Sequence, residues 1–409
     1  MWHPGCTCAL ESGGGLEPMT LMIYLDHNAT TPLAPEVLDA MMPFLTNRFG
    51  NAASRHHAVG CAAASAVEEA RGQVAEVIGA DSREIVWTSG ATESDNLALQ
   101  GVVHAPAYRK RHLVTVTTEH RAVLESCERL EQEGVRVTYV AVETDGRVNP
   151  DRLRQAITDD TLLVSVMHGN NETGVLQPIE EIGALCRERG VLFHTDATQS
   201  FGKEPIDVNV MHIDLLSASG HKIHGPKGVG LLYVRRRDPR VRCEPLIYGG
   251  GHERGLRSGT LNVPGIVGMG AAATRRMHSD VRVLRDRLEA ALCSQLGDVM
   301  VNGHLTQRLS NTTNLSFGGV DGDALMKRMP ELAVSSSSAC TSALLQPSYV
   351  LGAMGCGEVR ARSSVRFSLG RFTTSDEIDQ AVAMVRTAVT ELREHGGGSG
   401  STSPSECER

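Results

Sequence analysis

The stretch at residues 179–199, IEEIGALCRERGVLFHTDATQ, decides the fold class. Apolar residues at helical spacing run as far as Arg189, where a glycine follows. The apolar run Val191-Leu-Phe193 then predicts a short buried strand that ends in polar residues. A helix that leads directly into such a strand is the repeating unit of an α/β protein with a parallel sheet.

The same alternation extends outward on both sides of this stretch. Short apolar runs predict strands at residues 84–88, 113–116, 135–140, 162–167, 191–194, 213–217 and 230–234. Helical patterns fall between several of them, for example from Glu93 onward and at residues 121–132. We therefore expect an α/β fold with a mostly parallel, seven-stranded sheet between two layers of helices. Such sheets bind ligands at the carboxyl ends of their strands.

The pattern changes near residue 264. A helix-rich stretch reaches about Leu296, and short strands follow at residues 313–317 and 365–369 before a last helix from Ser375 to about Arg393. This predicts a smaller α+β domain. The expected division is an N-terminal extension without structure (1–20), a large domain (31–263), a small domain (21–30 and 264–394) and a flexible Gly/Ser tail (395–409).

Composition excludes several classes of function. The chain of 409 residues is 41% hydrophobic with a formal net charge of -8, so a large core can form and general attraction to nucleic acid or anionic membrane is not expected. The 10 cysteines are scattered without framework spacing, which favours a reducing, cytoplasmic compartment. Cys6 and Cys8 form a pair with no second pair nearby, so no metal site is expected.

Two motifs lie where a strand is followed by polar residues. Ser89-Gly-Ala-Thr-Glu-Ser94 joins a strand to a helix, and a helix N-terminus with small residues can receive a phosphate. Asp196 ends the strand in the opening stretch, where a carboxylate can hold a protonated ring nitrogen. Taken alone, the first motif is equally consistent with an ordinary helix N-cap, and the second slightly favours an N-cap.

The segment at residues 217–228, SASGHKIHGPKG, is more specific. It places Lys222 beside Ser219 and His221 directly after a predicted strand, where a desolvated lysine can form a Schiff base. By itself this residue could also be a solvated loop lysine. An anion cradle, a carboxylate and a reactive lysine together form the set that pyridoxal phosphate (PLP) requires.

Beyond these motifs, the chain resembles the cysteine desulfurases of the IscS/NifS type, class V members of the fold-type I PLP enzymes. The resemblance runs from about Ile23 to Leu392. Its matching segments are residues 24–32 (YLDHNATTP), 88–96 (TSGATESDN), 118–120 (TEH), 168–174 (HGNNETG), 196–199 (DATQ), 219–222 (SGHK), 249–260 (GGGHERGLRSGT), 335–342 (SSSSACTS) and 366–371 (RFSLGR).

The resemblance implies a role for individual residues around the cofactor. Lys222 would be the Schiff-base lysine and the base at the substrate Cα, and Asp196 would pair with the pyridinium nitrogen. His120 would stack on the ring and serve in proton transfer, and Gln199 would bond the ring hydroxyl. The implied phosphate cradle comprises Ala91, Thr92, Ser219, His221 and, from the partner subunit of a homodimer, Thr260.

The resemblance also implies how substrate is held and what becomes of its sulfur. Asn171 and Arg366 match the residues that hold the substrate carboxylate. Cys340 lies among small polar residues that favour an exposed loop, and it matches the nucleophile that takes the sulfur as a persulfide. The implied reaction converts L-cysteine to L-alanine and passes sulfur to an iron–sulfur scaffold or a thiolation protein.

Other activities use the same cofactor site. A class V aminotransferase needs no nucleophilic cysteine, so Cys340 argues against it. Selenocysteine lyase chemistry is closer and remains an alternative at this point.

Overall fold

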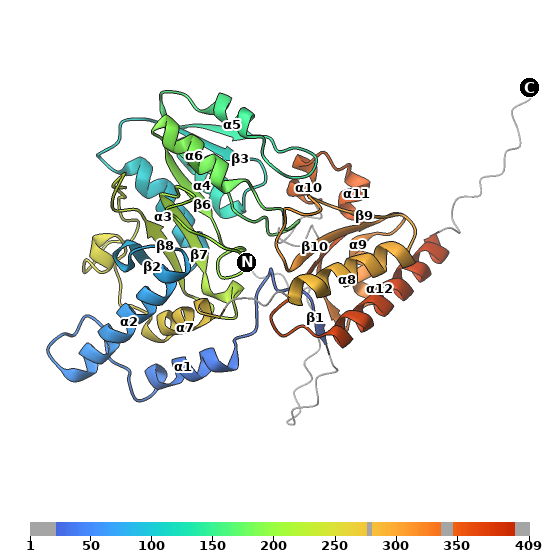
Figure 1. Cartoon of the computed structure of the whole chain (residues 1–409), viewed down its shortest axis with the longest axis horizontal. Coiled ribbons are helices and arrows are strands. Elements are labelled where there is room, and N and C mark those ends of the chain that lie inside the picture. Colours follow the sequence, from blue (N-terminus) through green and yellow to red (C-terminus); the bar gives the residue numbers. More distant parts are fainter. Residues whose placement is uncertain (1–21, 276–279, 337–346, 397–409) are drawn as a thin grey trace, which may run out of the picture.

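The computed structural model describes residues 22–275, 280–336 and 347–396. Cys340, the Cys6 and Cys8 pair, and the extensions predicted at residues 1–20 and beyond residue 396 lie outside these ranges. Within them, a seven-stranded sheet lies between layers of helices, and a four-stranded sheet forms a second layered unit (Figure 1). The predicted α/β fold class is confirmed.

The large sheet is mostly parallel, as predicted. Its strands, in spatial order, are β2 (Ile85–Thr88), β8 (Gly230–Val234), β7 (Leu215–Ser219), β6 (Leu192–Asp196), β5 (Thr161–Ser165), β3 (His112–Val116) and β4 (Arg136–Val140). Only β8 is antiparallel to its neighbours. Each strand lies within two residues of its predicted position.

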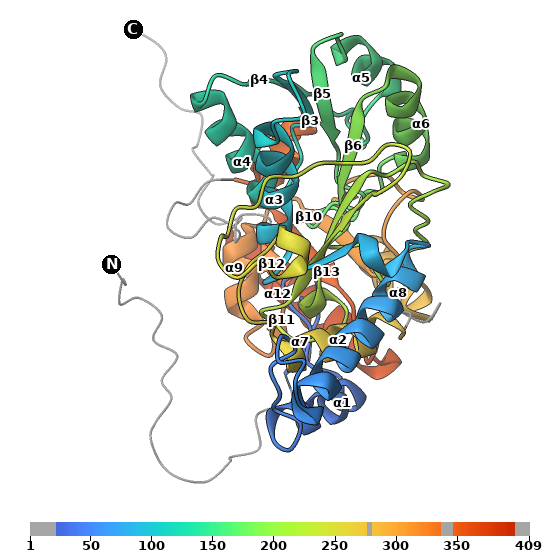
Figure 2. The same cartoon turned by 90° about the vertical axis from the view of Figure 1, so that its left-hand side faces the viewer.

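Successive side chains along each strand point to opposite faces of this sheet, so each face has its own hydrophobic core. Leu215 packs on one face and Leu216 on the other, and Leu232 and Leu231 on β8 do the same. One face carries α3 (Ala91–His104) and α4 (Arg121–Gln132). The other carries α1 (Pro35–Leu45), α2 (Ala58–Val77), α5 (Pro150–Ala156), α6 (Ile179–Arg189) and α7 (Val263–Ala273). Figure 2 shows α3 and α4 on one side of the strands and α5 and α6 on the other.

The second unit has its own hydrophobic core. Its antiparallel sheet has the order β12 (Ser335–Ser336), β13 (Ser364–Ser368), β10 (Thr312–Phe317) and β9 (Val299–Val301). The helices packed on this core are α8 (Asp280–Gln295), α9 (Gly322–Arg328) and α12 (Ser375–Gly396). The short helices α10 (Tyr349–Ala353) and α11 (Glu358–Arg362) instead place their buried residues in a core of the large sheet. The strand β1 (Ile23–Tyr24) joins the second unit by pairing with β11 (Leu332–Ala333). In the described part of the chain, no helix combines the length and the apolar character needed to cross a membrane.

A buried ion pair fixes the long loop that follows β8 to the sheet. Arg71 on α2 donates to both carboxylate oxygens of Glu253, at 2.7 and 2.8 Å, and both side chains are almost fully buried. The same carboxylate accepts from the backbone N–H of Trp87 at 2.9 Å. Glu253 lies in the short 3₁₀ turn η3 (Glu253–Gly255), so the pair holds residues 249–260 in place.

We expect Glu253→Gln to be strongly destabilising because it removes the buried counter-charge of Arg71 and leaves only the exposed carboxylate of Glu68. The loss is about 3–5 kcal/mol, typical of a buried pair that loses one partner. The measurement is guanidinium unfolding followed by circular dichroism. Glu358→Gln, which removes the exposed Arg362 pair within α11, is the control and should change little. Equal unfolding midpoints for the two variants would contradict the prediction.

Candidate active site

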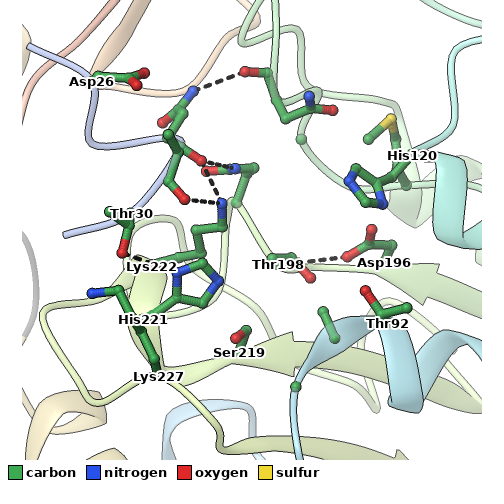
Figure 3. A pocket seen from close by; sticks show the side chains of 18 of the residues that line it. Asp26, Thr30, Thr92, His120, Asp196, Thr198, Ser219, His221, Lys222 and Lys227 are labelled. Carbon is green, nitrogen blue, oxygen red and sulfur yellow. Dashed lines mark hydrogen bonds between the residues drawn. The ribbon is translucent and has the colours of Figure 1, made fainter. Parts of the chain in front are cut away.

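A cavity of about 840 Å³ opens at the carboxyl ends of the parallel strands, between the two sheets. Its lining includes all the candidate residues in the described ranges except Thr260, which is exposed to solvent. Figure 3 shows His120, Asp196 and Thr92 on one side of the opening and Lys222, His221 and Thr30 on the other. The candidates brought together are Ala91, Thr92, His120, Asn171, Asp196, Gln199, Ser219, His221, Lys222 and Arg366.

Lys222 ends the 3₁₀ turn η2 (Gly220–Lys222), which follows β7 directly. Its Nζ donates to the backbone carbonyls of Asn28 at 2.5 Å and Ala29 at 2.8 Å. These carbonyls belong to the segment after β1, about 190 residues away in sequence. The lysine is therefore held at the cavity by hydrogen bonds and is no freely solvated loop residue.

Asp196 is buried at the end of β6, where one of its oxygens accepts from the backbone N–H of Thr198 at 2.8 Å. Two further carboxyl groups, Asp95 and Glu119, are fully buried nearby. Burial raises the pKa of both, and the charge of Asp196 raises each further. Both groups therefore keep a proton more readily than exposed carboxyls, which reduces repulsion at Asp196.

His120 is the N-cap of α4, and its Nδ1 accepts from the backbone N–H of Ala122 at 3.1 Å. Burial lowers the pKa of His120, and the neighbouring Lys222 lowers it further, while Asp196 opposes the shift. The ring is therefore neutral near pH 7. Because Nδ1 accepts a hydrogen bond, the proton of the neutral ring resides on Nε2.

The N-terminus of α3, at Thr92, lies on the same side of the cavity as His120 and Asp196 (Figure 3). Its N-cap, Gly90, makes no side-chain capping bond, so backbone N–H groups face the cavity beside Thr92 and Ser219. Gly230 packs against Gly90, because a Cβ at position 230 would stand 2.6 Å from the Gly90 Cα. No larger residue fits at position 230 without a shift of this backbone. Across from them, the His221 ring lies 3.2 Å from the Thr30 hydroxyl.

Arg366 on β13 closes the cavity from the second sheet. Its Nη1 donates to the backbone carbonyl of Asn171 at 2.8 Å, and its Nη2 donates to Asp26 at 2.6 Å. The side-chain Oδ1 of Asn171 is buried and has no hydrogen-bond partner among the described residues. A guanidinium beside a carboxamide can bind a small carboxylate.

Sequence reasoning assigned no role to several residues of the lining. Asp26, Thr30 and Ser335 lie within segments quoted for the resemblance, yet only the structure places them at the cavity. The sequence signal that could have identified Asp26 is its position directly after the short apolar run Ile23-Tyr-Leu25. Lys203, which is not part of the lining but donates to the lining residue Gln199 at 3.2 Å, was not predicted either; burial lowers its pKa to about 7.

Residues 23–381 match the sequence profile of the aminotransferase class-V family. A protein named cysteine desulfurase IscS from Rickettsia bellii is 53% identical over 385 residues, 93% of this chain and 94% of that protein. Another of the same name, from Anaeromyxobacter dehalogenans, is 55% identical over 382 residues, 92% of this chain and 94% of that protein. The chain belongs to the IscS-type cysteine desulfurases of the class-V aminotransferase family. The resemblance noted in the sequence is confirmed.

Solved structures agree with this assignment. A NifS-like protein superposes with a TM-score of 0.83 at 36% identity, covering 90% of this chain and all of that one. The structure titled SspA in complex with cysteine superposes with a TM-score of 0.77 at 39% identity, covering 86% of this chain and 99% of that one.

The family is PLP-dependent, and the cavity fits that cofactor. It offers a lysine, a buried carboxylate and an uncapped helix N-terminus, as a Schiff base, a pyridinium and a phosphate require. The predicted cofactor therefore stands.

Next to Asn171, Glu172 anchors the start of α10. It is 3% exposed, and its Oε2 accepts from the Ser348 hydroxyl at 2.5 Å. Burial raises the pKa of Glu172 from the ordinary 4.5 to about 7, opposed by Ser348, Arg366 and Arg121. Between these pH values the folded chain binds a proton here that the unfolded chain does not. The extra proton on Glu172 stabilises the folded chain. This contribution to the free energy of unfolding is fully present below pH 4.5 and is lost as the pH rises through 7.

Glu172→Gln should therefore gain stability relative to the parent protein as the pH rises from 5 to 8, because glutamine never ionises. The expected gain across this range is on the order of 3 kcal/mol. It is measured as the difference in unfolding free energy at each pH. Glu125→Gln, an exposed substitution on α4, is the control. A pH-independent difference for Glu172→Gln would contradict the prediction.

Proposed function

We propose that this protein is a PLP-dependent cysteine desulfurase that converts L-cysteine to L-alanine and takes the sulfur as a persulfide on Cys340. The observation that carries the proposal is the meeting of Lys222, Asp196 and Arg366 at one cavity in a chain of this family. Asp196 ends β6, Lys222 lies in the turn after β7, and Arg366 lies within β13 of the other sheet, so their meeting depends on the whole fold.

The residues of the cavity divide by the part of the cofactor that they would hold. Lys222 would bind it covalently, Asp196 would face the ring nitrogen, His120 would lie against the ring, and Gln199 would bond the ring hydroxyl. The phosphate cradle would comprise the α3 N-terminus at Ala91 and Thr92 together with Ser219 and His221. Bound PLP withdraws electrons from the substrate Cα and so makes its proton acidic.

The protein's own groups then bind substrate and move protons. Arg366 and Asn171 would hold the α-carboxylate, which fixes the substrate Cα near Lys222. The Lys222 Nζ would accept the Cα proton. The neutral His120, protonated at Nε2, suits transfer of a proton within the site.

Cys340 would complete the reaction from the segment at residues 335–342, whose composition supports an accessible thiol. Its thiolate attacks the substrate sulfur, so an S–S bond forms, the substrate C–S bond breaks, and the electron pair stays on the departing carbon. That carbon gains a proton to become the alanine methyl group. Cysteine and one thiol thus give alanine and one persulfide, with no outside oxidant.

We predict that Cys340→Ser retains the visible cofactor band yet releases neither alanine nor sulfide from L-cysteine with a thiol reductant present. Lys222→Ala should lose the covalent band as well as activity, because it removes the amine that binds PLP. Both are compared with the parent protein by absorbance and by product assay. Cys127→Ser, at a cysteine buried in α4, is the control and should keep full activity.

If Cys340→Ser releases both products at the parental rate, Cys340 is not the nucleophile. Lyase chemistry of the selenocysteine lyase type at the same PLP site would then replace the persulfide proposal. Formation of a keto acid that keeps its sulfur, in place of alanine, would instead indicate an aminotransferase.

We propose a homodimer in which the partner subunit's Thr260 completes the phosphate cradle. In support, Thr260 is exposed and lies away from the cavity of its own chain. Apolar side chains of α1 and the segment after it, namely Met42, Leu45 and Phe49, are exposed as well, which favours a covered face. The Arg71–Glu253 pair would hold the Thr260 loop in place for this contact.

Thr260→Val should weaken PLP retention by about tenfold or more, because it removes a hydroxyl donor to a charged phosphate while keeping the side-chain shape. The measurement is the rate of PLP release into a scavenging buffer. Thr274→Val, an exposed threonine at the end of α7, is the control. Equal release from Thr260→Val and the parent dimer would exclude this hydroxyl from the cradle.

We further propose that the persulfide passes to an acceptor protein, either an iron–sulfur scaffold or a protein of tRNA or cofactor thiolation. A cytoplasmic location suits this chemistry, because a thiol nucleophile must stay reduced. Six cysteines in the described part of the chain are free thiols, which agrees with such a compartment: Cys61, Cys127, Cys186, Cys243, Cys293 and Cys356.

A further inference from the structure

Asp26 is a carboxylate at the cavity for which the reaction described above has no use. It lies two residues after the end of β1, and its side chain is 17% exposed. Its Oδ1 accepts from the Arg366 Nη2 at 2.6 Å and from the Ser335 hydroxyl at 2.9 Å. The Ser335 hydroxyl also accepts from the same Nη2 at 3.0 Å, so the three polar groups contact one another.

Backbone pairing places these groups together. Ser335 lies directly opposite Arg366 in the β12–β13 ladder. Asp26 bridges to Ser368, two residues beyond Arg366 and therefore on the same side of β13. Backbone N–H groups of Leu25 and His27 bond to Ala333 and Ser368, so Asp26 is fixed beside the arginine.

The guanidinium of Arg366 is thus engaged on two sides. Nη1 donates to the Asn171 carbonyl and Nη2 to Asp26 and Ser335, while the buried Nε has no hydrogen-bond partner among the described residues. A substrate carboxylate that binds this guanidinium must share it with a carboxylate of the protein. The two negative charges then lie within a few ångströms of each other, beside a guanidinium that is almost fully buried.

We propose that Asp26 is an internal competitor of the substrate α-carboxylate, a positioning residue that orients Arg366 and weakens its affinity for carboxylates. The inference rests on the proposed function, in which Arg366 holds that carboxylate. L-Cysteine and L-alanine carry the same carboxylate, so attraction to it binds substrate and product alike and does not raise kcat. Weaker attraction assists release of alanine while Arg366 keeps its orientation.

The test uses the PLP-loaded enzyme and compares L-alanine with L-alaninamide, which lacks the carboxylate. Asp26→Asn keeps the size and a hydrogen-bond acceptor but removes the charge. We expect it to bind L-alanine at least about fourfold more tightly, even if the missing repulsion is screened as in water. L-Alaninamide should bind no more tightly than to the parent enzyme. Calorimetric titration gives the dissociation constants, and the KM for L-cysteine should fall without a rise in kcat.

Two matched variants separate charge from structure. Ser335→Ala removes a hydrogen bond to Asp26 but keeps its charge, so it should not tighten L-alanine binding. Glu289→Gln removes the carboxylate that pairs with Arg308, outside the cavity, and should leave both dissociation constants unchanged. Asp26→Ser, also uncharged, repeats the measurement if Asp26→Asn does not fold.

Arg366→Gln distinguishes failure of this inference from failure of the proposed function. If Arg366→Gln weakens L-alanine binding but neither Asp26 variant tightens it, the competitor role is overturned and the carboxylate site stands. If Arg366→Gln binds L-alanine as the parent does, Arg366 is not the carboxylate site, and both the competitor role of Asp26 and the substrate-binding role proposed for Arg366 fall. Equal tightening of L-alanine and L-alaninamide would also overturn the competitor role.

Discussion

The parallel pairing of β6 with β7 is the constraint on which the site depends. Asp196 lies opposite Ser217 in this ladder, so the two strands end at the same edge of the sheet and bring Asp196 and Lys222 to one cavity. A slip of one residue would turn Asp196 to the other face, because side chains alternate along a strand. On the far side of β7, the first residue of β8, Gly230, lies against Gly90 and so positions the N-terminus of α3.

The second sheet completes this cavity because residues from both ends of the chain meet in it. β13 supplies Arg366, and the segment after β1 supplies Asp26 and the carbonyls that hold Lys222. Asn28 connects the two sheets, since its side chain donates to the carbonyl of Asn171 and to the hydroxyl of Thr312. The catalytic groups therefore lie between two hydrophobic cores that are each well packed on their own.

The interior behind the cavity is polar but carries little charge. Burial lowers the pKa of His194 to about 3 and raises that of Glu119, so the charged form of each group is disfavoured. The ring nitrogens of His194 lie 2.8 and 3.0 Å from the hydroxyls of Ser165 and Ser217, which lowers the cost of burying it. Charged groups are thereby concentrated at the cavity surface, where ligands can pair with them.

The sequence alone determined the fold class, the strands of the large sheet, and the positions of Asp196 and Lys222 at strand ends. These features are local: apolar spacing reports which face of an element is buried, and strand ends follow from it. The strands β9, β11 and β12 have two or three residues each and carry no periodic signal, so they were not predicted. The roles of Thr260 and Cys340 remain predictions from the resemblance.

Only the tertiary structure decided which groups meet. Asp26 and Arg366 are 340 residues apart, and Arg71 and Glu253 are 182 apart. Neither pair has a spacing that a sequence pattern could reveal, since each depends on strand register and chain closure across the whole molecule. The physical reason is that local patterns encode burial, whereas the pairing of distant charges is fixed by the backbone hydrogen bonds that align the strands.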